Sequence, residues 1–116
     1  MFMLLNYLIL PFLKKLTFSI YNVNNLYLAN LPNITELPSK LGNVHTLTLK
    51  NLPNIKKLPS ELCKVRNLEL INLINIKELP LSFGNMHSLK LWTLPKLKKL
   101  PLFLSNIHTL RLWDFQ

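Results

Sequence analysis

The chain has 116 residues, of which 49% are hydrophobic and 16% are charged, and its formal net charge is +9 at pH 7. This length and composition indicate one ordered domain with a sizeable apolar core, and they exclude a disordered chain. The single cysteine, Cys63, has no partner for a disulfide within the chain, so we expect it to fill space as a small side chain.

Residues 1–13, MFMLLNYLILPFL, are apolar enough to suggest a secretory signal. However, no basic segment precedes them, no small-residue cleavage site follows, and the run is too short to span a bilayer. Leu5 also lies in phase with the repeat that fills the rest of the chain. We therefore expect a degenerate first repeat, no membrane span and a cytoplasmic protein.

A 21-residue pattern begins at Leu5 and recurs without insertion or deletion. A fixed short period indicates a stack of similar units, none of which buries its apolar face alone. We therefore predict a single domain over residues 1–116. Its repeats are residues 5–25, 26–46, 47–67, 68–88 and 89–109, with a partial copy at 110–116.

The start of each repeat has the alternation of a short strand, as in Leu47-Thr48-Leu49. A period of two places Leu47 and Leu49 toward the core and Thr48 outward. The same alternation predicts that Ala29 and Ser88 point outward in other repeats. We expect parallel strands near Leu5, Leu26, Leu47, Leu68, Leu89 and Leu110.

Prolines interrupt the second half of each repeat. Pro53 and Pro59 lack a backbone donor and fix φ, so the stretch from Leu52 to Leu58 should be turn-like or extended. Proline is accepted at a first helical position, and one turn of 3₁₀ or α-helix can therefore start at Pro59. We predict little helix on the side opposite the sheet.

The pattern resembles that of the leucine-rich repeat family, LxxLxLxxN/CxL, at Val44, Leu47 and Leu49. The resemblance implies an α/β solenoid whose parallel sheet lines a concave face and whose convex face has mostly irregular, extended or 3₁₀ segments. The repeats look most like those of plant nucleotide-binding immune receptors, and less like those of bacterial effectors. The function implied is a protein–protein interaction module for recognition or scaffolding in defence or signalling.

One position departs from the family pattern, because Leu52 and its equivalents replace the usual Asn or Cys. The turn backbone must then find other hydrogen-bond partners. Asparagine often bonds turn backbone, so neighbouring asparagines are candidates. The two candidate sets are Asn30, Asn51 and Asn72, or Asn33, Asn54 and Asn75.

The outward side of the predicted sheet carries candidate binding residues. Trp92 and Trp113 hold equivalent places one repeat apart, and exposed Trp and Arg dominate binding hot spots at about 2 kcal/mol or more each. The alternative is that further repeats or a cap cover these side chains in a longer protein. The predicted partner-binding residues are Tyr27, Thr48, Lys50, Glu69, Lys90, Trp92, Arg111 and Trp113.

A basic ladder follows the strands, at the predicted turns. A solvated edge explains it most simply, and an acidic protein partner is the alternative. Nucleic acid is a poorer candidate, because the aromatic residues lie on the sheet face and do not alternate with the lysines. The ladder consists of Lys14, Lys15, Lys56, Lys57, Lys77, Lys98 and Lys99.

No catalytic constellation emerges from the sequence. His45, His87 and His108 share one repeat phase, with Arg66 in the remaining slot. Adjacent strands are about 4.8 Å apart, so two of these imidazoles can lie close together, but zinc normally needs three or four ligands. We therefore expect no metal site, no cofactor and no enzymatic activity.

A competing interpretation is a structural fragment of a larger receptor, or a degenerate gene product without independent activity. It is motivated by the lack of polar end caps, since Met1 and Phe2 begin the chain while Trp113 and Phe115 lie near its end. Terminal repeats need a polar outer face. We accordingly expect self-association through the ends.

Overall fold

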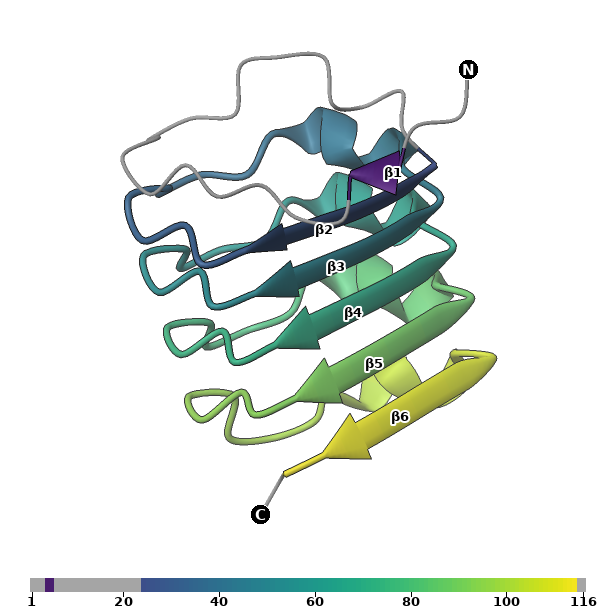
Figure 1. Cartoon of the computed structure of the whole chain (residues 1–116). Coiled ribbons are helices and arrows are strands. Elements are labelled where there is room, and N and C mark those ends of the chain that lie inside the picture. The colour runs from purple at the N-terminus through teal and green to yellow at the C-terminus, as the bar shows by residue number, and fades with distance from the viewer. Residues whose placement is uncertain (1–3, 6–23, 115–116) are drawn as a thin grey trace.

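The computed structural model describes residues 4–5 and 24–114, so most of the first repeat, including Lys14 and Lys15, lies outside the described residues. Six strands form one parallel sheet in chain order (Figure 1). This confirms the prediction of parallel strands at the repeat starts, including the one near Leu5. The strands are β1 (Leu4–Leu5), β2 (Asn25–Ala29), β3 (Thr46–Lys50), β4 (Asn67–Ile71), β5 (Ser88–Trp92) and β6 (Thr109–Trp113).

The strand register repeats the sequence period. Leu26 pairs with Leu47, and Leu47 pairs with Leu68, so each residue lies beside its equivalent 21 positions away. Because side chains alternate along a strand, this register stacks the leucines of every repeat on one side of the sheet. A slip by one residue would move the leucines to the solvent side.

Each repeat from 26–46 to 89–109 returns through a single 3₁₀ turn behind the strand layer (Figure 1). Every turn follows a proline, and the Leu62 amide donates to the carbonyl oxygen of Pro59 over 3.1 Å. Proline suits this place because its φ is already near the helical value and its own donor is not needed. The turns are η2 (Ser39–Asn43), η3 (Ser60–Lys64), η4 (Leu81–Asn85) and η5 (Leu102–Asn106).

Between each strand from β2 to β5 and the 3₁₀ turn that follows it, the chain forms neither helix nor strand, and in the repeat 47–67 it turns at Pro53 and Asn54, as the prolines predict. No helix among residues 4–5 and 24–114 is long and apolar enough to cross a membrane.

The apolar core runs without interruption through the described repeats. In the repeat 47–67, Leu47 and Leu49 enter it from the strand, Leu52 and Ile55 from the return segment, and Leu62 from the 3₁₀ turn, all fully buried. The neighbouring repeats bury the residues at the same repeat positions. Each repeat therefore completes its core only against the repeats on either side, as the fixed period predicts.

Two outward positions differ from the prediction. Ala29 and Ser88 lie in the outward phase of their strands, yet both are buried. Ala29 pairs in register with Lys50, while Ser88 lies between Asn67 and Thr109. Alanine and serine have short side chains that rise little above the sheet, so an outward phase does not by itself keep them exposed.

The residue directly after each strand from β2 to β6 has a positive φ. Asn30, Asn51, Asn72, Thr93 and Asp114 have φ between 52° and 60°. Asparagine tolerates this left-handed conformation better than most residues, whereas β-branched threonine does not. The turn still continues the sheet, because the backbone amide of Asn51 donates to the carbonyl oxygen of Ile71 over 3.2 Å.

Candidate functional site

Asparagine side chains link the turns of successive repeats. The Asn51 amide donates to Asn30 Oδ1 over 2.8 Å, and the Asn72 amide donates to Asn51 Oδ1. In the second set, Asn54 donates to the carbonyl oxygen of Pro32 and Asn75 to that of Pro53. Of the two predicted alternatives, the second set bonds the turn backbone, through Asn54 and Asn75, whereas the first set forms a ladder between side chains.

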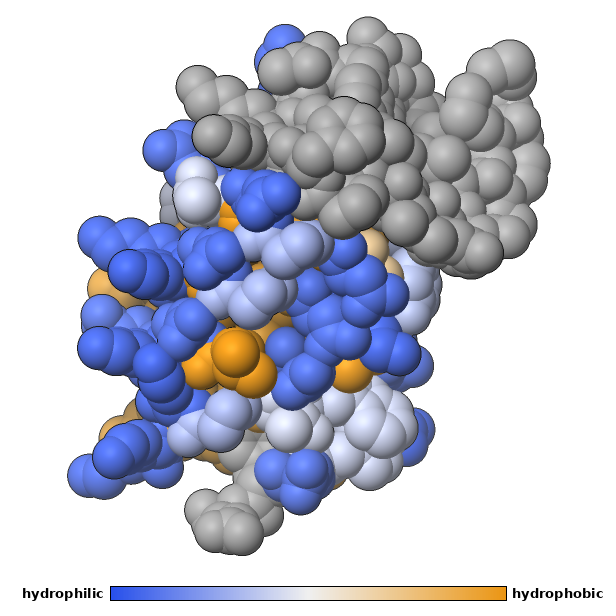
Figure 2. Space-filling model, turned by 60° about the vertical axis from the view of Figure 1, so that its left-hand side comes forward, coloured by the Kyte–Doolittle hydropathy of each residue, from blue (hydrophilic) through white to orange (hydrophobic). Residues whose placement is uncertain are grey.

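A hollow lies at the strand ends, beside the first asparagine set. It has a volume of about 390 Å³ and is lined by Asn30, Asn51 and Asn72 together with the apolar residues Pro32, Pro53 and Ile74. Figure 2, which turns this side of the molecule forward, shows apolar surface enclosed by hydrophilic side chains. The hollow provides an apolar contact surface at the edge of the sheet.

The predicted partner-binding residues lie in two adjacent rows across the sheet. Register places Tyr27, Thr48, Glu69, Lys90 and Arg111 side by side on consecutive strands. The second row, which is two positions further along each strand, contains Lys50, Ile71, Trp92 and Trp113. The structure therefore brings all eight predicted residues onto one face of the sheet.

The two tryptophans of this face form a stacked pair. The rings of Trp92 and Trp113 are 3.8 Å apart between centroids and 10° from parallel. Trp92 Nε1 also donates to Glu69 Oε2 over 2.7 Å. Both rings stay partly exposed, so the pair offers a held aromatic surface to a partner.

Charges border this aromatic pair. Lys90 pairs in register with Glu69 on one side and with Arg111 on the other. Aromatic and arginine side chains together are the combination enriched at binding hot spots. The arrangement can bury an apolar group of a partner while presenting cations beside it.

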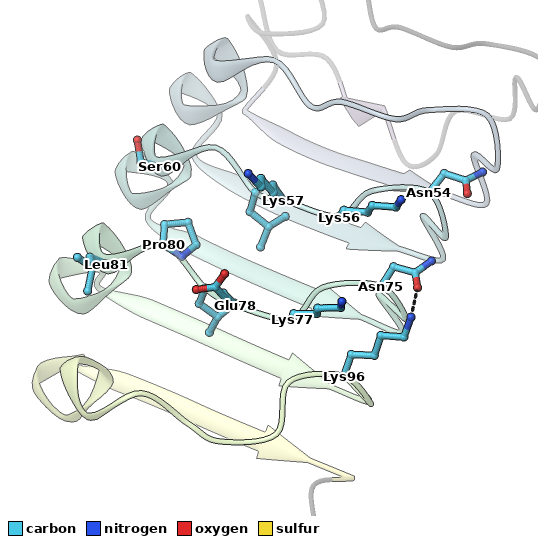
Figure 3. A pocket seen from close by; sticks show the side chains of 12 residues that line it. Asn54, Lys56, Lys57, Ser60, Asn75, Lys77, Glu78, Pro80, Leu81 and Lys96 are labelled. Atoms are coloured by element: carbon cyan, nitrogen blue, oxygen red, sulfur yellow. Dashed lines mark hydrogen bonds between the residues drawn. The ribbon is translucent and has the colours of Figure 1, made fainter.

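Three lysines of the basic ladder line a groove behind the sheet. Lys56, Lys57 and Lys77 belong to the extended return segments, just beyond the turns where the ladder was predicted. The chain turns at Pro53 and Asn54, before it reaches Lys56 and Lys57, so the lysines follow the turn and do not form it. The groove has a volume of about 830 Å³ (Figure 3).

Only some lysines of the predicted basic ladder line the groove. Lys98 and Lys99 are exposed but do not line the groove. Lys96 does line it, and its ammonium donates to Asn75 Oδ1 over 2.6 Å. Lys96 was missed because it shares the repeat phase of the asparagines and not that of the other lysines. An alignment of the repeats would have shown Lys96 beside Asn75, because it lies 21 residues later at the same repeat position.

The histidine line is formed as the repeat phase predicts. His87 and His108 stack with centroids 4.6 Å apart, and Arg66 Nη2 lies 3.4 Å from His87 Nε2. Desolvation, followed by the charges of Arg66 and His108, lowers the pKa of His87 below its ordinary value of 6.5. A guanidinium beside the imidazole favours the neutral acceptor form.

No cluster of three or more His, Cys, Asp or Glu side chains suited to a metal ion occurs in the part of the chain that the structure describes. Cys63 is a free thiol, partly buried against the core.

Comparison of the chain with family models, curated proteins and solved structures gave no match.

Proposed function

We propose that the chain is a leucine-rich-repeat solenoid that works as a protein-binding module, with its sheet on the concave face. One parallel strand per 21-residue repeat and a 3₁₀ turn behind it support this assignment. The resemblance to plant nucleotide-binding immune receptors favours a cytoplasmic role in defence or signalling. The module acts by binding and carries out no reaction.

The observation that carries this proposal is the Trp92–Trp113 stack on the sheet face. Each ring is held by the other, and Trp92 is held further by Glu69. A side chain that is already ordered loses less conformational entropy when a partner binds. The pair is accordingly the proposed anchor of the interface, with Lys90 and Arg111 beside it.

The test starts with affinity capture and identification of partners by mass spectrometry, followed by affinity measurement with the purified partner. Replacement of Trp92 and Trp113 by Ala should weaken binding about tenfold or more, because roughly 1.4 kcal/mol gives a factor of ten. The melting temperature of the variant should show that the fold is retained.

Leu102 supplies the control. It is also a large apolar residue, it is 91% exposed, and it belongs to the 3₁₀ turn η5, away from the sheet face and from the groove lining. Replacement of Leu102 by Ala should leave the affinity unchanged. Equal affinity of the tryptophan variant and the unmodified chain would move the interface away from the sheet face.

A further inference from the structure

We propose that the basic groove behind the sheet is a second binding site and that it takes an acidic, extended peptide segment of a protein partner. The groove is formed by consecutive return segments and is distinct from the tryptophan face. Its proposed ligand class follows from its charge, its length along the repeats and its apolar wall.

The cations of the groove lie on successive repeats. Lys56 and Lys77 occupy equivalent positions, and Lys57 and Lys96 complete the set (Figure 3). Neighbouring repeats are about 4.8 Å apart, so these ammonium groups form a row along the stack and do not converge on one point. A row of this kind suits several carboxylates along an extended chain better than a single small anion.

The described residues neutralise the positive charge of the groove only in part, since Glu78 is the one carboxylate among four lysines in its lining. Lys96 donates to the neutral side chain of Asn75. Within residues 4–5 and 24–114, no hydrogen bond or ion pair engages Lys56, Lys57 or Lys77, although Glu78 also lines the groove. Lysine repulsion therefore persists in the free protein, and an acidic ligand would relieve it.

The basic row ends toward the N-terminal side. A neighbouring hollow of about 460 Å³ shares Lys56 and Lys57 with the groove, but its other wall has Thr35 and Glu36. Glu36 occupies the repeat position that Lys57 has in the next repeat, so a negative charge replaces a positive one there. The carboxylates of a bound peptide are thus expected to lie between Lys56 and Lys96.

The groove also has an apolar side. Leu81 lines it and is 80% exposed, and Pro80 lies next to it. A peptide that alternates acidic and aliphatic side chains can meet the lysines and this apolar wall together. Nucleic acid fits less well, because the lining residues include no aromatic ring on which a base would stack.

The test uses a fluorescein-labelled peptide of alternating Glu and Leu residues, with fluorescence anisotropy as the readout. The unmodified chain should bind it, and the same peptide with Gln in place of Glu should not bind. Lys56→Gln combined with Lys77→Gln should raise Kd about fivefold to tenfold, because two exposed ion pairs, each of modest strength, are lost together.

Lys40→Gln combined with Lys64→Gln is the control, since it removes the same charge from exposed residues of η2 and η3 that do not line the groove. This variant should retain the peptide affinity. An equal loss in the two double variants would show attraction by net charge alone and would overturn the groove as a site. Tighter binding of a single-stranded oligonucleotide that depends on Lys56 and Lys77 would overturn the peptide assignment.

The two binding proposals fail independently. Trp92→Ala with Trp113→Ala should leave binding of the Glu-Leu peptide unchanged, because these residues lie on the sheet face and the groove lies behind it. Loss of peptide binding in that variant, with the fold retained, would place the peptide on the sheet face and contradict the groove.

Discussion

The side-chain amide of Asn51 donates to the side-chain oxygen of Asn30, which lies 2.8 Å away and one repeat earlier. Both residues hold the left-handed backbone conformation that ends each strand. The equivalent position in the fifth repeat is Thr93, with φ of 52°. A β-branched residue in this conformation is strained by about 1–3 kcal/mol.

Thr93→Asn should therefore raise the free energy of unfolding by about 1 kcal/mol, because it relieves part of this strain and places a side-chain amide beside Asn72, which outweighs the exposed hydrogen bond from Thr93 Oγ1 to Asp114 Oδ2 that it removes. Urea denaturation measures the change. The reverse substitution, Asn51→Thr, should lower stability. A Thr93→Asn protein no more stable than the unmodified chain would contradict the role given to asparagine here.

Leu49→Asp should unfold the chain. Leu49 is fully buried, and an unpaired charge in this core costs several kcal/mol against a total stability of roughly 5–15 kcal/mol. Circular dichroism and thermal melting report the loss. Thr46→Asp is the control, since Thr46 is a partly exposed residue of the same strand and should tolerate the change. An unchanged melting temperature for Leu49→Asp would show that the core is not packed as described.

Gly42→Ala should destabilise the protein through a steric clash between repeats. A Cβ at Gly42 would lie 2.4 Å from the carbonyl oxygen of Glu61 in the next 3₁₀ turn. The turns must move apart to admit it, at a cost of about 1–3 kcal/mol. Ser105→Ala, at the equivalent position of the fifth repeat, should be nearly neutral. Equal melting temperatures for the Gly42→Ala variant and the unmodified chain would rule out this close packing.

Acid should weaken the protein partly through His87. Its pKa is lowered in the folded state, so the unfolded state binds more protons between that pKa and 6.5. The stabilising contribution is complete above pH 6.5 and is lost as the pH falls through the folded-state pKa. His87→Gln should reduce this pH dependence in urea denaturation measured at several pH values. A His87 proton titration by NMR at or above 6.5 would contradict the prediction.

Self-association should occur through the edge of β6. Leu112 is 37% exposed, whereas its register partner Leu91 is fully buried, and β6 pairs on one side only among the described strands. Sedimentation should detect dimers or larger species that increase with salt, because the charge of +9 is screened beyond about 8 Å.

Leu112→Lys should reduce this association, since a lysine on an edge strand opposes pairing with another chain. Leu81→Lys is the control, because it makes the same change away from β6. A single monomeric species of the unmodified chain at every salt concentration would disprove association through this edge.

The 21-residue phase predicts most of this architecture, because one register determines every strand and every inward leucine. It does not predict that Ala29 and Ser88 are buried, since side-chain length, and not phase, decides how far a residue rises above the sheet. The phase places Trp92 beside Trp113 but leaves open the rotamer that brings Trp92 to Glu69. Lys96 lines the groove but lies at the repeat position that asparagine occupies in the preceding repeats. The periodicity of the lysines therefore did not predict it, and the predicted set of groove residues was incomplete.

The asparagine ladder has a polarity. Asn51 and Asn72 each donate toward the repeat before them, whereas Thr93 Oγ1 donates toward the repeat after it, to Asp114 Oδ2 over 2.9 Å. The direction of donation thus reverses between residues 68–88 and 89–109. Duplication of the repeat 47–67 would preserve the donor–acceptor matches of this ladder, whereas an exchange of 47–67 with 89–109 would remove the hydroxyl that donates to Asp114. Repeats with the same backbone therefore differ in the direction in which their turns are linked.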